Sequence, residues 1–107
     1  MSEIWATMTW TPRPGEEGAF VDAWRELATF VGQAEGVGTL RMTRNVSDPS
    51  HFISFACWES AEAYDAWKAK QAFTEGLARV RAHVITATPA DFEVVATVGG
   101  QPRPPTF

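Results

Sequence analysis

Cysteine and histidine are scarce in this sequence, and their scarcity restricts the chemistry that the chain can perform. Cys57 is the only cysteine, so the chain cannot form an internal disulfide. The two histidines, His51 and His83, are isolated and show no HxH spacing. Such residues give no metal site, and no glycine-rich phosphate loop follows a predicted strand, so no metal or nucleotide cofactor is expected.

Basic residues and long apolar runs are also few. Nine Lys and Arg are scattered among thirteen Asp and Glu, which gives a net charge of −4. Without a basic stripe, binding to nucleic acid is not expected. No apolar stretch approaches the roughly 18 residues of a membrane helix, and the start, MSEIWATM, lacks the pattern of a signal peptide. We therefore expect a cytoplasmic protein that does not bind a membrane.

Aromatic residues, by contrast, are abundant. Five Trp and seven Phe occur in 107 residues, and two Trp and the single Tyr lie within FACWESAEAYDAW, residues 55–67. Large rings bury much area each, so they either enlarge a small core or line a cavity. The length argues for one domain, placed at residues 1–98, followed by a Gly- and Pro-rich tail at 99–107 that cannot pack by itself.

The periodicity of apolar residues predicts the order strand, helix, strand, strand, helix, strand. The predicted strands are residues 4–11, 39–46, 51–58 and 92–98. Helical spacing predicts one helix at 16–31 and a second that begins after Ser60 and runs through Val80. A break near Lys70 is an open alternative to one continuous second helix. This order is typical of an α+β, ferredoxin-like βαββαβ fold, a four-stranded antiparallel sheet with its helices on one face.

The third predicted strand has two faces of different character. One face carries Phe52, Ser54, Ala56 and Trp58, and the other carries His51, Ile53, Phe55 and Cys57. If the first face looks toward the helices, its small central residues leave room for a flat aromatic ligand between the two rings. The alternative is that Phe20, Trp24 or Leu77 from the helices fills the gap.

Two segments, PGEEGAFVDAWRELATFV and FACWESAEAYDAW, resemble the antibiotic biosynthesis monooxygenase family. The likeness covers roughly residues 3–98, and the W-E-S-x-x-A-Y corner is a moderately specific mark of the family. The resemblance implies dimeric α+β barrels and cofactor-independent oxygenases that act on aromatic polyketides or quinols. It also implies relatives that degrade haem and members without a known reaction.

In the polyketide-oxidising branch, the resemblance implies a Trp and a Tyr in the pocket, and Trp58 and Tyr64 match them. The Asn that precedes the Trp by four positions in that branch is Ser54 here, so a hydroxyl replaces an amide. An Arg on the second helix also belongs to the pattern, and Arg79 lies within one residue of its place. The resemblance thus implies a catalytic set of Trp58, Tyr64, Ser54 and Arg79.

The haem-degrading branch fits the sequence less well. Trp67 matches its helical Trp, but Met8 stands at the place of its pocket Asn and Leu77 at that of its iron-ligating His. His83 lies six residues farther along, on the wrong side of the helix. The sequence therefore disfavours haem degradation.

Two functions from different classes remain open. The first is a cofactor-independent monooxygenase that oxidises a polycyclic phenol, anthrone or quinol to a quinone, although no general base is evident. The second is a non-catalytic protein that binds a small aromatic ligand in the same pocket. The residues expected to contact the ligand are Phe52, Ala56, Trp67, Trp24, Phe20 and Leu77. The expected partners are this ligand, O₂ and a second copy of the chain, which would cover the apolar outer face of the sheet.

Overall fold

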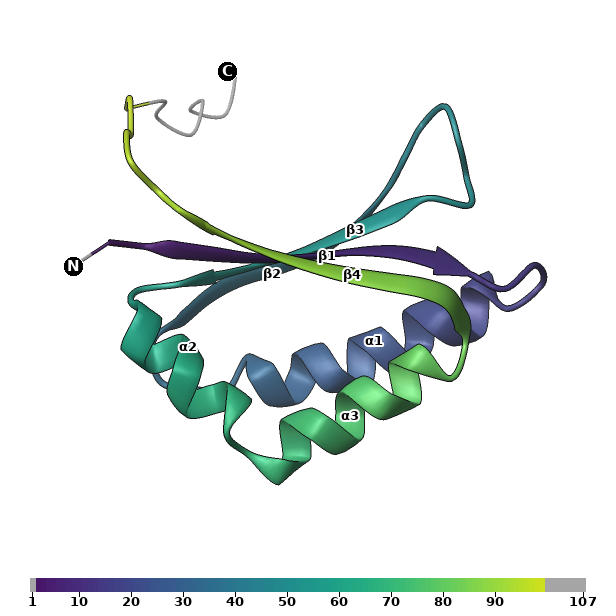
Figure 1. Cartoon of the computed structure of the whole chain (residues 1–107), viewed down its shortest axis with the longest axis horizontal. Coiled ribbons are helices and arrows are strands. Elements are labelled where there is room, and N and C mark those ends of the chain that lie inside the picture. Colours follow the sequence, from purple (N-terminus) through teal and green to yellow (C-terminus); the bar gives the residue numbers. More distant parts are fainter. Residues whose placement is uncertain (1, 100–107) are drawn as a thin grey trace, which may run out of the picture.

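The computed structural model of the protein describes residues 2–99, in which four strands and three helices follow one another (Figure 1). The elements are β1 (Ile4–Pro12), α1 (Glu17–Val31), β2 (Val37–Arg44), β3 (Phe52–Trp58), α2 (Ala61–Lys68), α3 (Gln71–Arg81) and β4 (Val84–Glu93). The strands form one sheet in the order β2-β3-β1-β4, and all neighbouring pairs are antiparallel. This confirms the predicted α+β, ferredoxin-like fold.

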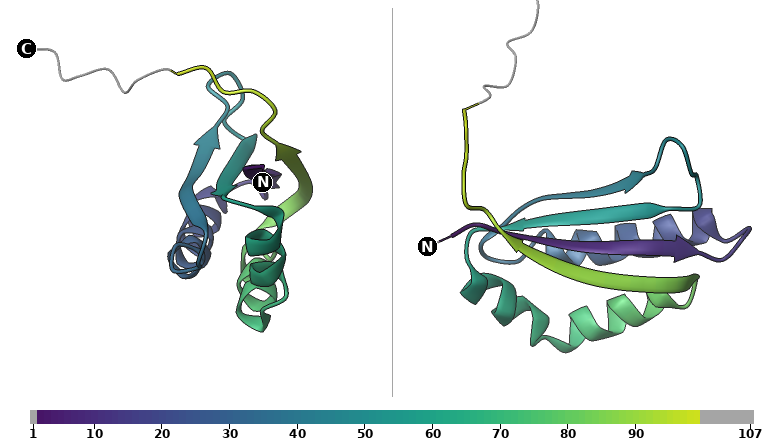
Figure 2. Two further views of the ribbon diagram at one scale, coloured as in Figure 1. Left: turned by 90° about the vertical axis from the view of Figure 1, so that its left-hand side faces the viewer. Right: turned by 45° about the horizontal axis from the view of Figure 1, so that its top comes forward.

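All three helices lie on the same side of the sheet (Figure 1). In the end-on view, α1 runs below the β2 edge, and α2 and α3 run below the β4 edge (Figure 2). We call this side of the sheet the helix-facing side and the other side the outer face. Side chains on the helix-facing side build the core, so an internal site has to form there.

Helix α1 forms because its apolar residues recur with helical spacing. Phe20, Leu27 and Val31 are buried along one stripe of the helix. This stripe packs against α3, where Gly76 allows a close approach. A methyl group at Gly76 would lie only 2.6 Å from Leu27 Cδ1. The missing side chain at this position therefore sets the distance between the two helices.

The second helical segment is broken near Lys70, which was one of the two predicted alternatives. Ser60 caps α2, because its side chain accepts a hydrogen bond from the backbone N–H of Ala63 at 3.2 Å. Lys70 has an extended backbone, with φ −82° and ψ 139°. An extended residue cannot continue the helical hydrogen bonds, so the chain changes direction before α3 (Figure 1).

The last strand was predicted too late in the chain. The prediction was residues 92–98, whereas β4 spans Val84–Glu93 and residues 94–99 are in no strand. Pro89 obscures this strand in the sequence, because proline has no N–H to give to a sheet. Since β4 is an edge strand, it tolerates a proline whose missing N–H faces the open side.

Two other predictions concern the C-terminal tail and the ability of the chain to cross a membrane. The predicted tail at 99–107 lies outside the described residues except for Gly99, which is exposed, so the division into domain and tail stays a prediction. Within residues 2–99, no helix has the length and apolar character that crossing a membrane requires.

Replacing Gly76 by Ala is expected to destabilise the protein, because the new methyl group would crowd Leu27 in the core. Overpacking costs about 1–3 kcal/mol, and better helix propensity returns up to about 1 kcal/mol. We expect a net loss of about 1 kcal/mol in the free energy of unfolding. Gly18→Ala is the matched control, because no atom lies within 4 Å of its added methyl group. Thermal unfolding should rank Gly76→Ala below Gly18→Ala, and equal stability would contradict the close approach.

Candidate active site

The third strand turns its rings and small residues toward the helices. Phe52, Ser54 and Trp58 are buried on the helix-facing side, and Ala56 between them is half-buried. The residues that point to the outer face are each partly exposed: His51, Ile53, Phe55 and Cys57. The orientation on which the pocket prediction depended is therefore present.

A cavity lies between the sheet and the helices beside the short side chains of β3. The space that admits the centre of a water-sized sphere is about 90 Å³, within about 600 Å³ of empty space that continues into solvent. The strands contribute Ala6, Met8, Ser54 and Ala56 to its lining, and the helices contribute Trp24, Leu27, Tyr64, Trp67, Phe73 and Leu77. The residues that line the cavity carry no formal charge. Trp24 and Leu77, two of the predicted alternative fillers, line the cavity without filling it.

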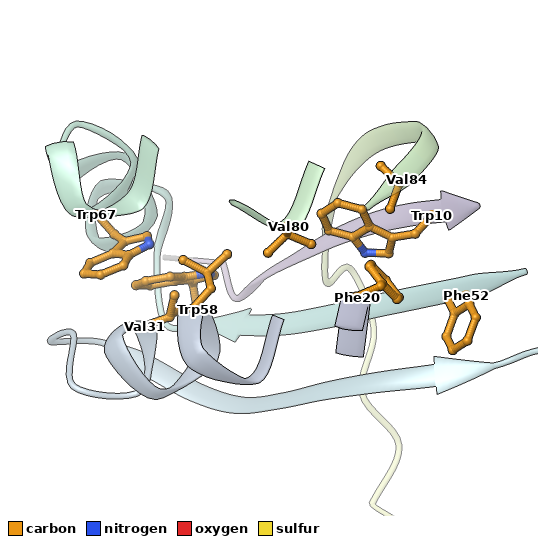
Figure 3. Close-up of a cluster of buried hydrophobic side chains, with 9 residues drawn as sticks. Trp10, Phe20, Val31, Phe52, Trp58, Trp67, Val80 and Val84 are labelled. Atoms are coloured by element: carbon orange, nitrogen blue, oxygen red, sulfur yellow. The ribbon is translucent and has the colours of Figure 1, made fainter. Parts of the chain in front are cut away.

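The rings of Trp10, Phe20 and Phe52 fill one end of the layer between the sheet and the helices, and we call them the ring cluster. Phe20 packs against Trp10 with ring centroids 5.4 Å apart and against Phe52 at 5.2 Å. All three side chains are at most 2% exposed. Figure 3 shows the ring cluster at one end of the buried residues and Trp58 and Trp67 at the other. Because rings occupy one end of the layer, the open space is left beside the short side chains.

Ser54 already takes part in a buried hydrogen bond. Trp10 Nε1 donates to Ser54 Oγ at 2.9 Å and so links β1 to β3. The Ser54 oxygen is the acceptor of this bond, so the Ser54 hydroxyl can still donate its own hydrogen to another group. Ser54 is therefore a donor in the cavity wall, and Trp10 fixes its position.

Tyr64 joins α2 to β4 at the edge of the cavity. Its hydroxyl donates to Asp91 Oδ1 at 3.0 Å, and its ring centroid lies 5.6 Å from that of Trp58. Lys68 Nζ lies 4.0 Å from the centroid of the Tyr64 ring. Burial, and then the hydrogen bond and negative charge of Asp91, raise the pKa of Tyr64 well above its ordinary value of about 10. Tyr64 is thus a neutral group whose proton points at a carboxylate.

Two indole N–H groups in the cavity wall have no acceptor. Trp58 Nε1 and Trp67 Nε1 are buried and make no hydrogen bond with any described residue. Both side chains line the cavity. A buried donor without a partner costs about 1–3 kcal/mol. A bound group with an acceptor oxygen would therefore be stabilised at either position.

The structure brings most, but not all, of the predicted site residues together. Those that line the cavity are Ser54, Ala56, Trp58, Tyr64, Trp67, Trp24 and Leu77. Phe20 and Phe52 belong to the ring cluster and do not line the cavity. Arg79 is exposed on α3 and is not among the lining residues. The chemical roles assigned to these residues stay predictions.

Sequence reasoning missed two residues of the site, Trp10 and Asp91. Asp91 lies in the segment where the strand was predicted too late, and the observed register places it opposite Ala6, on the helix-facing side. Alternation counted from the buried Val84 would have placed Asp91 on the outer face, because the register of β4 with β1 shifts between Thr11 and Pro12. The contact between Trp10 and Ser54 depends on the register of β1 with β3, for which the sequence contains no local signal.

The titratable groups offer no metal cluster in the described part of the chain. Within residues 2–99, no three His, Cys, Asp or Glu side chains come close enough to hold a metal ion. His83 pairs with Glu16, with Nδ1 and Oε1 3.0 Å apart, and neither residue lines the cavity. This pair joins the turn before β4 to the start of α1, so its place in the fold is structural.

Tyr64 is the only tyrosine in the sequence, so the ultraviolet absorbance of tyrosinate reports its ionisation alone. We expect no tyrosinate in the folded protein near pH 10, where the unfolded chain titrates. The folded state holds this proton more tightly, so the stability that Tyr64 contributes is present below about pH 10 and falls as the pH rises further.

Asp91→Asn tests the causes of this shift. It should lower the pKa of Tyr64 but leave it above that of the unfolded chain, because burial is the largest cause. Tyrosinate that forms at the same pH in folded and unfolded protein would contradict both the burial of Tyr64 and its hydrogen bond to Asp91.

Solved structures share this fold at low sequence identity. A mutant of SnoaB, a cofactor-independent oxygenase from Streptomyces nogalater, has a TM-score of 0.85 and 17% identity, over 94% of this chain and 100% of its own. An antibiotic biosynthesis monooxygenase has a TM-score of 0.74 and 20% identity, over 87% and 99%. A conserved protein from Methanosarcina mazei Go1 has 0.79 and 13%, over 86% and 92%. At such identities, these likenesses show the fold alone.

The family of the chain is established by comparison of its sequence with other sequences. No protein of curated function matches it. The family model for antibiotic biosynthesis monooxygenase, however, matches residues 4–79, from β1 into α3. The matched region contains β3 and α2, which supply Ser54, Trp58 and Tyr64 to the cavity. The chain therefore belongs to the antibiotic biosynthesis monooxygenase family.

Proposed function

We propose that the protein is a cofactor-independent monooxygenase that oxidises a polycyclic phenol, anthrone or quinol to a quinone. The observation that carries the proposal is an uncharged, aromatic-lined cavity whose edge holds a tyrosine bonded to a carboxylate. Membership in the family supports the same reaction class. With a phenol or an anthrone, one O₂ is consumed, one oxygen atom becomes the new carbonyl oxygen, and the other leaves as water. With a quinol, no oxygen atom is inserted, and O₂ takes up two electrons and two protons and leaves as hydrogen peroxide.

The cavity wall supports this chemistry through its hydrogen-bond donors. The substrate must lose a proton and pass an electron to O₂, so its anion needs donors in a site that excludes water. Ser54 has a hydroxyl hydrogen to give, and Trp58 has an indole N–H without an acceptor. In this proposal both donate to the oxygen on which the negative charge develops.

Asp91 is the proton acceptor in this proposal. Tyr64 already donates its proton to Asp91 Oδ1 at 3.0 Å. A substrate hydroxyl that donates to the Tyr64 oxygen passes its proton to Tyr64 while the tyrosine proton moves to Asp91. Tyr64 remains neutral throughout, in agreement with its raised pKa. Asp91 is exposed, so it can release the proton to water.

The size of the cavity limits how such a substrate is held. Its volume of about 90 Å³ is below the about 150 Å³ of an engineered core cavity that holds benzene. A polycyclic substrate therefore places its reacting ring inside and extends its other rings into the space that continues to solvent.

The second candidate function is non-catalytic binding of an aromatic ligand. It is favoured by the internal hydrogen bonds of the two polar side chains, because Ser54 Oγ accepts from Trp10 and the Tyr64 hydroxyl donates to Asp91. If these bonds persist when a ligand binds, the cavity holds the ligand without moving a proton. Oxygen consumption separates the two functions.

Metal-free protein incubated with a panel of anthrones, phenols and hydroquinones is expected to consume O₂, one molecule for each quinone made from an anthrone. Asp91→Asn should lower kcat about 100-fold or more, because an amide still accepts from Tyr64 but cannot take its proton. Glu93→Gln is the matched control, since Glu93 is the next carboxylate on the same side of β4. Uptake no faster than a denatured-protein blank would exclude the enzyme for these substrates, and normal turnover by Asp91→Asn would remove Asp91 from the proton path.

We further propose that two chains associate through the outer faces of their sheets. Trp5 stands opposite Phe92 in the register of β1 with β4, and these side chains are 39% and 57% exposed. The Trp5 ring also contacts that of Phe55 edge-on, with centroids 6.1 Å apart. Exposed neighbouring rings on one face favour a partner. A two-fold axis would let each outer face cover the other.

Light scattering at micromolar concentration should report about twice the 11.8 kDa mass of the chain. Phe55→Glu should give monomer or aggregate, because the interface would bury an unpaired carboxylate. Phe30→Glu is the control, since Phe30 is 54% exposed on α1 and lies on the helix side. A wild-type protein that stays monomeric at high concentration would contradict the association.

A further inference from the structure

Two of the five tryptophans bury an N–H that has no acceptor, and both line the same cavity. Trp58 is 1% exposed and Trp67 is 6% exposed. Their Nε1 atoms are the two buried side-chain nitrogen or oxygen atoms of residues 2–99 that lack a hydrogen-bond partner. Native proteins pair nearly all such atoms, so two exceptions in one cavity wall point to a ligand.

Two of the other three tryptophans have a paired indole N–H. Trp10, equally buried, donates from Nε1 to Ser54 Oγ at 2.9 Å. Trp5, on the outer face, donates from Nε1 to Glu3 Oε1 at 2.6 Å. The fold thus pairs one buried and one exposed indole elsewhere, whereas the two buried, unpaired indoles lie together at one end of the buried residues (Figure 3).

No side chain of the cavity wall accepts a hydrogen bond from Trp58 or Trp67. No lining residue carries a carboxylate or a side-chain amide. Two of the lining hydroxyls already make other bonds, because Ser54 Oγ accepts from Trp10 and the Tyr64 hydroxyl donates to Asp91. A ligand that complements this wall is therefore flat and apolar, and it brings acceptor oxygens with it.

We propose that Trp58 and Trp67 are a pair of donors that hold two acceptor oxygens of one flat aromatic ligand, and that Trp67 determines specificity. The ligand class is a quinone or an aromatic hydroxyketone. A hydrocarbon of the same shape would leave both donors unpaired and bind more weakly. The inference rests on the proposed function only for the choice of this cavity as the substrate site.

The surroundings of Trp67 hold its ring in place and add a charge preference. Its ring makes an edge contact with Phe73, with centroids 6.2 Å apart, and Lys70 Nζ lies 5.9 Å from its centroid. Trp67 also borders a surface groove whose charged residues are Glu35, Glu59, Glu62 and Lys70. Three carboxylates against one ammonium disfavour an anion on that side, so the ligand binds in its neutral form.

The test uses 2,3-dimethyl-1,4-naphthoquinone, whose methyl groups block addition of the free thiol of Cys57. The indole N–H signals of ¹⁵N-labelled protein are assigned with single Trp→Phe variants and followed during titration. The signals of Trp58 and Trp67 should shift downfield, while that of Trp5 stays in place. The matched hydrocarbon, 2,3-dimethylnaphthalene, should not produce these downfield shifts. A quinone titration that leaves the Trp67 signal unmoved would overturn the proposal.

Affinity gives a second measurement that does not depend on the spectra. Trp67→Phe and Trp58→Phe should each weaken quinone binding about tenfold, because a ligand oxygen loses its donor. Melting temperature should not fall in proportion, since each change also removes an unpaired buried donor. Trp5→Phe is the matched control and should bind like the wild type. Equal affinity of Trp67→Phe and wild type would also overturn the proposal.

The test of the donor pair and the test of the proposed oxygenase reaction can fail independently of each other. Quinone binding with both signals shifted, but without O₂ uptake on any substrate, would support the donor pair and remove the enzyme. O₂ uptake with unchanged quinone affinity in Trp67→Phe would support the enzyme and remove Trp67 as an anchor.

Discussion

The site depends on an uneven layer of side chains between the sheet and the helices. Protein interiors normally pack densely, so a gap in the middle of such a layer persists only where the walls cannot collapse. The ring cluster fills one end of the layer and keeps the helices away from the sheet there. The close approach of α1 to α3 at Gly76 joins the two helices, so neither moves inward alone. Ser54 and Ala56 then leave space between walls that other residues hold apart.

Local signals in the sequence were sufficient for much of this arrangement. The alternation on the third strand separated its two faces, and the burial of Phe52 and Trp58 shows which of them packs inward. Ser60 caps the start of α2, as its hydrogen-bonding capacity predicts. Each of these features depends on neighbours within a few positions of the chain, where side-chain period and backbone preference act directly.

Features that depend on pairing between distant segments could not be predicted. Pro89 made residues 84–93 look unlike a strand, so β4 and its Asp91 were not predicted. A sheet tolerates proline at an edge, but the order of the strands cannot be read from the sequence. The bond from Trp10 to Ser54 requires the register of β1 with β3. Whether Trp24 and Leu77 fill the pocket or line it depends on helix positions, which packing decides after the elements have formed.

The presence of Ser54 at the place of the family's asparagine changes the number of hydrogen-bond donors in the cavity wall. Where the family resemblance implies an asparagine, whose amide has two hydrogens to give, this chain has one hydroxyl, and Trp10 already occupies its oxygen. The wall keeps the indole N–H of Trp58, which the family pattern shares, and that of Trp67, and both stay unpaired at about 1–3 kcal/mol each. That is a substantial part of a typical folding stability of about 5–15 kcal/mol. Two such costs in one wall are best explained by a role in binding, because packing alone would be served better by phenylalanine.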